Sequence, residues 1–208
     1  MDLSAVPYPW PGRTIVCLGG GPSLVPEDID TCRAAGALLL AVSNTYQLAP
    51  DAVAVFSSDQ KWWRWHLAAL EHPGLKFMLP PCNDVRLRSV TVLRRAGQIG
   101  LELQDRGAIR SGGHSGYAAV NLAAHLVGPG SRILLLGYDL QPTGGKHHWF
   151  GDHPDKTHPR YTQWLPIYQT ALAPLQAAHI TLINCSRDTA IPAVPRLPLD
   201  DALHARPA

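Results

Sequence analysis

The stretch Ile133-Leu-Leu-Leu-Gly-Tyr-Asp139 decides the fold, because it joins a short apolar run to a glycine and then to a carboxylate. An uninterrupted apolar run of this length is typical of a strand that is buried on both faces, as in a parallel sheet. Asp139 then stands at the carboxyl end of that strand, where α/β proteins assemble their ligand sites. The sequence therefore predicts an α/β fold with a site beside Asp139.

A second strand with a glycine-rich end lies near the start of the chain, Thr14-Ile-Val-Cys-Leu-Gly-Gly-Gly-Pro-Ser23. Strand-length apolar runs occur at 14–18, 37–42, 52–56, 75–79, 132–137 and 180–184. Segments with helical periodicity occur between them, at 24–35, 59–70, 115–127, 159–178 and 198–203. This alternation favours a Rossmann-like α/β fold, a mostly parallel sheet with helices on both faces. Residues 80–112 leave the structure open, apart from a candidate edge strand at 89–93.

The length of 208 residues suits a single domain, 1–208, with peripheral extensions at 1–12 and 186–208. Hydrophobic residues make up 46% of the chain and charged residues 16%, which indicates a packed globule. No apolar run is long enough for a membrane span, and the first residues do not resemble a secretory signal. We therefore expect a cytoplasmic protein, in the host cytoplasm if it is encoded by a phage, with its four separated cysteines reduced.

Two glycine-rich turns precede predicted helices. The first contains Gly19, Gly20, Gly21, Pro22 and Ser23. The second, Ser111-Gly-Gly-His-Ser-Gly116, places Ser115 and Gly116 at the start of a helix. Backbone N–H groups in such turns and at helix N-termini suit a phosphate, while tight turns or close packing explain the same glycines without a ligand. Neither turn is a P-loop or a full dinucleotide fingerprint.

The loop Lys146-His-His-Trp-Phe-Gly-Asp-His-Pro-Asp-Lys-Thr-His158 is rich in imidazoles and carboxylates. These residue types permit a metal site, although the spacing matches no zinc motif, and histidine also suits a general base near neutral pH. We expect His158, at the start of the last long helix, to be that base. Asn44 and Asp59 follow two other strands and either hydrogen-bond a base or ribose or cap the local backbone.

With these residues in view, the chain resembles a Rossmann-like group that contains lipooligosaccharide sialyltransferases, motility-associated factor glycosyltransferases and pterin pyrophosphokinase-like proteins. It is most similar to small phage and prophage members of that group. The resemblance rests on Ser-Gly-x-x-Ala-x-Asn-Leu-Ala, Leu-Gly-Tyr-Asp and His-Trp-Phe-Gly-Asp-His-Pro, and it spans the chain from Val16 to about Leu203.

The resemblance implies a glycosyltransferase that uses a nucleotide-activated sugar. It implies donor contacts for the turn 19–23, Asn44, Ser115 and Gly116, with His158 as catalytic base and Arg110 near an active-site arginine. Gln141 and His147 stand where the sialyltransferases hold the donor phosphate with two tyrosines, so a different activated sugar is implied, or a diphosphate donor with a divalent ion near Asp139. The full set of expected site residues combines this resemblance with the pattern above: catalytic His158, Arg110 and Asp139; donor-binding Gly19, Gly20, Gly21, Pro22, Ser23, Asn44, Asp59, Ser115, Gly116, Gln141, His147 and His148.

No tightly bound cofactor is expected, with Mg²⁺ or Mn²⁺ at Asp139 and Asp152 as the candidate metal site. We expect the acceptor to be a glycan or DNA, and a homo-oligomer is compatible with the sequence. Two alternatives stay open. One is a magnesium-dependent diphosphokinase of the pterin pyrophosphokinase-like type, which releases AMP from ATP. The other is a non-catalytic nucleotide- or nucleic-acid-binding phage protein whose contact surface is a group of arginines: Arg86, Arg88, Arg94, Arg95, Arg106 and Arg110.

Overall fold

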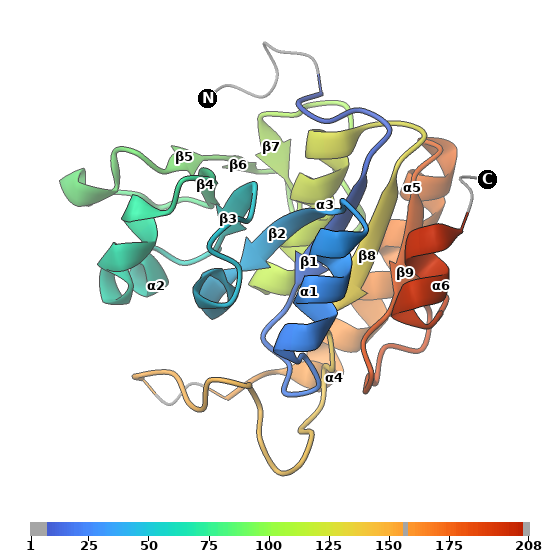
Figure 1. The fold of residues 1–208 in the computed structure, drawn as a ribbon. Coiled ribbons are helices and arrows are strands. Elements are labelled where there is room, and N and C mark those ends of the chain that lie inside the picture. The colour runs from blue at the N-terminus through green and yellow to red at the C-terminus, as the bar shows by residue number, and fades with distance from the viewer. Residues whose placement is uncertain (1–7, 156–157, 206–208) are drawn as a thin grey trace.

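The computed structural model describes residues 8–155 and 158–205 and has the expected Rossmann-like α/β fold (Figure 1). Its main sheet has seven parallel strands in the order β5-β4-β3-β2-β1-β8-β9. The strands are β1 (Thr14–Leu18), β2 (Leu38–Val42), β3 (Ala54–Phe56), β4 (Leu75–Met78), β5 (Thr91–Val92), β8 (Arg132–Leu136) and β9 (Thr181–Asn184). Residues 1–7 of the expected N-terminal extension lie outside the described residues.

The central strands are buried on both faces, which is why their sequences show apolar runs without polar alternation. In β1, Ile15 and Cys17 belong to the hydrophobic core on one face of the sheet, and Val16 and Leu18 belong to the core on the other face. All four side chains are fully buried. The sheet therefore separates two cores, each of which is closed by helices.

Helices cover both faces of the sheet. One core includes residues of α3 (Ser115–Val127), the 3-10 helix η4 (Leu165–Ala171) and α5 (Leu172–Ala177). The short α4 (Tyr161–Trp164) directly precedes η4 in the chain. The other includes residues of α1 (Pro26–Ala34), α2 (Gln60–Trp65), the 3-10 helix η2 (Leu67–Glu71) and α6 (Leu199–His204). Figure 1 shows α1 and α6 in front of the sheet and α3 behind it.

Helix α3 has the predicted bounds, because alanines allow it to pack closely on the sheet and Gly128, with φ of 65°, ends it. The helix predicted at 59–70 is divided, since α2 ends at Trp65 and a 3-10 helix follows His66. The segment 159–178 is irregular, as expected from Pro166 and Pro174, which cannot donate backbone hydrogen bonds.

The region left open by the sequence, 80–112, adds the edge strand β5 and one 3-10 helix, η3 (Val85–Leu87). It also forms a separate two-stranded parallel sheet from β6 (Arg94–Arg95) and β7 (Ala108–Ile109). Its arginines are engaged by neighbours: Arg86 pairs with Asp84, and Arg94 pairs with Asp105. These acids neutralise part of the basic surface on which the nucleic-acid-binding alternative depends.

The C-terminal extension expected to be peripheral contributes to both cores. Ile191 and Val194 are buried in the core that contains α3, and Leu203 is buried in the core that contains α1. All four cysteines are free thiols. Within 8–155 and 158–205, none of the helices combines the length and apolar character required to span a bilayer.

Strand order places a topological switch point between β1 and β8. The chain continues from β1 to β2 on one side, and β8 later pairs with the other side of β1. In open parallel sheets, this change of direction leaves a crevice at the carboxyl ends of the two strands. Both predicted motifs, the glycine turn after β1 and Gly137 to Asp139 after β8, border that crevice.

Candidate functional site

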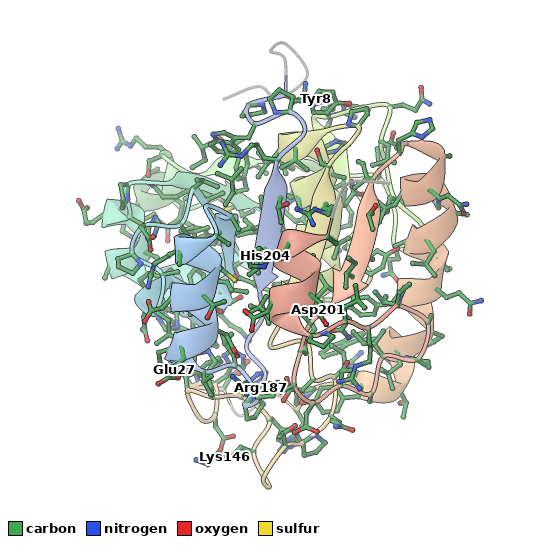
Figure 2. All side chains as sticks on the ribbon, turned by 45° about the vertical axis from the view of Figure 1, so that its right-hand side comes forward. Tyr8, Glu27, Lys146, Arg187, Asp201 and His204 are labelled. Carbon is green, nitrogen blue, oxygen red and sulfur yellow. The ribbon has the colours of Figure 1, made fainter. Side chains whose placement is uncertain are left out.

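A cavity of about 910 Å³ opens at the carboxyl edge of the sheet. The glycine turn 19–21, the ends of β2 and β3, the start of α3 and the segment 158–168 line it. The covering loop, residues 140–155, runs beyond this edge (Figure 1), and it carries the Lys146 labelled in Figure 2. Trp149 N donates a 3.0 Å hydrogen bond to Gly20 O, which fixes the covering loop over the glycine turn.

The glycine turn packs against the end of β8. Gly19 N donates to Leu136 O at 2.7 Å, and Gly21 N donates to Gly137 O at 2.8 Å. A Cβ atom at Gly19 would lie 2.5 Å from Gly137 O, and one at Gly21 would overlap the Asp139 carboxylate. Close packing, the simpler of the two readings of this motif, therefore accounts for Gly19 and Gly21, whose N–H groups are already used by the protein.

Asp139 fixes the turn from inside the crevice. Its carboxylate accepts a 2.6 Å hydrogen bond from the Ser23 hydroxyl and a 3.0 Å bond from Ser23 N. Burial raises the pKa of Asp139, and the two bonds from Ser23 oppose that rise. Asp139 is only 1% exposed, yet it lines the cavity. The two bonds from Ser23 give it a structural contact, and its expected catalytic role stays a prediction.

The expected metal pair is not assembled. Asp152 is exposed in the covering loop and does not belong to the cavity wall. Within the part of the chain that the structure describes, no group of three or more His, Cys, Asp and Glu side chains is placed to hold a metal ion. The described residues thus do not fit the divalent-ion site that was considered at Asp139 and Asp152.

The N-terminus of α3 faces the cavity with its first turn free of a side-chain cap. His114 is the N-cap residue and makes no capping hydrogen bond, while 112–116 all line the cavity. The Ser115 hydroxyl oxygen accepts a 3.0 Å bond from Ser58 N, so its own hydrogen points elsewhere and can be donated. The first N–H groups of a helix lack intrahelical acceptors and carry the positive end of the helix dipole, so this end of α3 suits an anion.

Several expected donor-binding residues lie behind the cavity wall. The Asn44 side-chain oxygen accepts a 2.7 Å hydrogen bond from Trp62 Nε1, and Asn44 therefore positions α2. The Ser23 hydroxyl donates its hydrogen bond to Asp139. Like Ser23, Pro22 and Gln141 do not line the cavity. Other expected residues are brought together in the wall: Gly19, Gly20, Gly21, Asp59, Ser115, Gly116, His147, His148 and His158.

Arg110 also lies outside the cavity wall. Its Nη1 donates a 2.9 Å hydrogen bond to Ile99 O, and its backbone N–H donates to Asn121 Oδ1. This position corrects the expectation that Arg110 is the active-site arginine. Arg95, on the neighbouring two-residue strand, lines the cavity instead.

The imidazoles of the cavity differ in environment. His148 stacks on Phe150, with 4.9 Å between ring centroids, and burial lowers the pKa of His148 to about 4. Burial also lowers the pKa of His153, against the effect of Asp155. His158 is exposed at the cavity wall, and its ring centroid lies 6.0 Å from that of His147. Of these, His158 is the one that the solvent reaches most freely.

Sequence reasoning missed part of the site. Lys61 on α2 forms an ion pair with Asp155 of the covering loop, and both line the cavity with Arg160. Elsewhere in the wall, His114 stacks on Trp164, with 4.6 Å between centroids, next to buried Tyr168. His114 lies inside the second glycine turn and Asp155 inside the loop 146–158, both of which the sequence singled out, whereas no motif distinguishes the other four residues.

The comparisons with known proteins leave the family open. No protein-family model matches the chain, and no curated protein matches it. BdcA from E. coli is 16% identical with a TM-score of 0.31, over 86% of this chain and 85% of that chain. A short-chain dehydrogenase/reductase from Serratia marcescens BCRC 10948 is 11% identical with a TM-score of 0.33, over 85% and 74% of the two chains. BdcA in complex with NADPH gives 16% identity and a TM-score of 0.31, over 85% and 70%. Scores this low carry no argument about function.

Proposed function

We propose that this protein is a glycosyltransferase that transfers a sugar from a nucleotide-activated donor to a hydroxyl group of an acceptor. The observation that carries this proposal is the cavity at the switch point, into which the uncapped N-terminus of α3 projects. Its volume of about 910 Å³ lies in the upper range of small-molecule sites. The donor phosphate would bind the first turn of α3 and the Ser115 hydroxyl.

Two arginines of the cavity wall suit an anionic donor. Arg95 and Arg160 line the cavity from β6 and from the approach to α4, whereas the third cation, Lys61, is paired with Asp155. Cations near a leaving phosphate stabilise the charge that develops on it as the glycosidic bond breaks. His158, exposed at the same cavity, would take the proton of the acceptor hydroxyl. Arg95 would thus take the role that the resemblance implied for Arg110.

Other Rossmann-type activities find less support in this site. Dinucleotide-binding proteins place a carboxylate after the second strand to bind the ribose, and this chain has Ser43 and Asn44 there. The diphosphokinase alternative requires Asp139 to hold a magnesium ion, and Ser23 already engages both of its oxygens. A metal-independent sugar transfer makes neither demand.

The test is to incubate the full chain, with and without Mg²⁺, with a panel of nucleotide sugars and with ATP. Released nucleotides are identified by mass spectrometry. We expect a nucleoside mono- or diphosphate from one sugar nucleotide, without a metal requirement. Release of AMP from ATP only with Mg²⁺ would refute glycosyl transfer in favour of the diphosphokinase. Silence with every donor, repeated with glycan and DNA acceptors present, would refute transfer altogether.

His158→Gln tests the base and has a matched control. We expect the His158 variant to lose at least about a hundredfold in turnover, the usual scale of a lost general base, with little change in nucleotide affinity. His204→Gln changes a histidine on α6, away from the covering loop (Figure 2), and should leave turnover unchanged. Equal turnover in the two variants would show that His158 is not the base.

A further inference from the structure

The wall between α3 and α4 contains buried polar atoms that no protein group satisfies. Tyr168 is fully buried, and within the described residues its hydroxyl has no hydrogen-bond partner. The same holds for Nε2 of His114, whose ring centroid lies 5.7 Å from that of Tyr168. Both residues line the cavity. Buried polar groups in folded proteins are nearly always hydrogen-bonded, so two neighbouring exceptions at a cavity wall point to a ligand.

Comparison with adjacent tyrosines shows that this is specific to Tyr168. The rings of Tyr117 and Tyr138 lie edge-on to the Tyr168 ring, at 5.4 and 6.2 Å. The Tyr117 hydroxyl donates to Gly100 O, and the Tyr138 hydroxyl donates to Gly116 O. The fold thus provides hydrogen-bond partners for the two neighbouring phenols, and within the described residues it leaves the Tyr168 hydroxyl without one.

The unpaired atoms adjoin an aromatic surface. Trp164 stacks on His114 at an interplanar angle of 25°. Gly113, with φ of 77°, lies directly beside the indole, because a Cβ atom there would be in van der Waals contact with Trp164 Nε1, at 3.4 Å. A flat ligand face can pack on such a surface while its polar edge bonds to the neighbouring side chains.

The polar groups of this wall are uncharged. Burial lowers the pKa of His114 to about 3, and burial raises the pKa of Tyr168 well above its usual range. A charged ligand group would find no opposite charge on either side chain. A sugar hydroxyl both donates and accepts, so it can pair with a phenol and with either tautomer of a neutral imidazole.

We propose that His114, Trp164 and Tyr168 form the acceptor subsite and bind a neutral sugar ring, its apolar face on the indole and its hydroxyls on His114 Nε2 and Tyr168 Oη. This inference rests on the proposed function and names its acceptor class. A row of neighbouring rings connects the subsite to the proposed base. From Trp164, Tyr161 is the next ring at 6.1 Å between centroids, His147 follows at 5.8 Å, and His158 follows at 6.0 Å.

The experiment measures binding of methyl glycosides of glucose, galactose, mannose and N-acetylglucosamine to the full chain by saturation-transfer NMR. Adenosine, cytidine and uridine form a second set of probes. Tyr168→Phe removes only the unpaired hydroxyl, and Tyr117→Phe removes a paired hydroxyl from the same aromatic cluster. Thermal unfolding is recorded for both variants.

We expect at least one methyl glycoside to bind, and Tyr168→Phe to weaken it by about tenfold or more, the cost of one lost hydrogen bond to a buried group. Because this hydroxyl has no protein partner, the Tm of Tyr168→Phe should equal or exceed that of the parent. Tyr117→Phe should lower Tm and leave glycoside affinity unchanged.

Three results would overturn the inference: no glycoside binds, Tyr168→Phe binds as well as the parent, or the loss affects nucleosides and not glycosides. The last result would assign the wall to the donor base. Glycoside binding that depends on Tyr168, together with silence in the nucleotide-release assay, would refute the proposed function while leaving the sugar subsite in place. Nucleotide release without glycoside binding would do the reverse.

Discussion

Replacement of Asp139 tests whether this carboxylate is structural or catalytic. Two hydrogen bonds from Ser23, at 2.6 and 3.0 Å, end on it. Hydrogen bonds to a charged group contribute about 1.5–3 kcal/mol each, so the pair contributes about 3–6 kcal/mol. Burial of the charge, which also raises the pKa of Asp139, offsets part of this gain. We therefore expect Asp139→Ala to lower the free energy of unfolding by about 2–4 kcal/mol.

Asp139→Asn separates the two roles. Its amide oxygen can accept from Ser23 N and its NH₂ group can donate to the Ser23 hydroxyl, so the expected loss is about 1 kcal/mol. Because the folded-state pKa of Asp139 is raised, the parent loses stability as pH rises from the ordinary aspartate pKa through the raised value. The Asn variant should lack this decline.

Urea denaturation at several pH values measures these free energies, with the slope m as a check on two-state behaviour. Exposed Asp152→Asn is the control and should change stability by less than about 0.5 kcal/mol. If Asp139→Asn is as unstable as Asp139→Ala, the hydrogen-bond account is wrong. If it is stable, binds nucleotide and yet has no turnover, Asp139 is catalytic and the structural assignment fails.

Three other predictions concern the same edge of the sheet. Gly21→Ala should cost about 3 kcal/mol or more, because its methyl group overlaps the Asp139 carboxylate; wild-type stability in urea would contradict the packing account. Because the pKa of His148 is lowered to about 4, the free energy of unfolding of the parent should fall by at most about 3 kcal/mol as pH falls from 6.5 through 4. In acid denaturation, His148→Phe should lose less of this free energy. Equal losses in the two proteins would show that His148 is not responsible. Lys61→Met breaks the ion pair with Asp155, and it should lower the free energy of unfolding by under about 1 kcal/mol. It should also speed protease cleavage within 147–155. An unchanged cleavage rate would show that this pair does not hold the covering loop.

Elements with local determinants were predictable from the sequence. The apolar run of β1 and the alanine-rich stretch of α3 lie where they were predicted, because the first is buried on both faces and the second is bounded by glycine turns. The strands β6 and β7 were not predictable, since two residues are too few to show periodicity. The break of the helix at His66 has no glycine or proline to indicate it.

The location of the candidate site was predictable from the sequence, whereas the roles of its residues were less predictable. The carboxyl edge of the sheet follows from strand order, which glycine-ended strands indicate. The roles of individual residues depend on distant neighbours that no local pattern reports. Gly19 and Gly21 are explained by the end of β8, and the cavity wall includes Arg95 and not Arg110.

The hydrogen bonds between Ser23 and Asp139 join positions 116 residues apart in the chain. During synthesis the turn after β1 therefore leaves the ribosome long before the carboxylate that holds it in place. Contacts of such separation close late, because the entropy of a long loop must be overcome before they form. The crevice should thus be among the last parts of the molecule to form. A nascent chain that ends before β8 lacks one of the two strands that border the crevice, and it should have no affinity for a nucleotide.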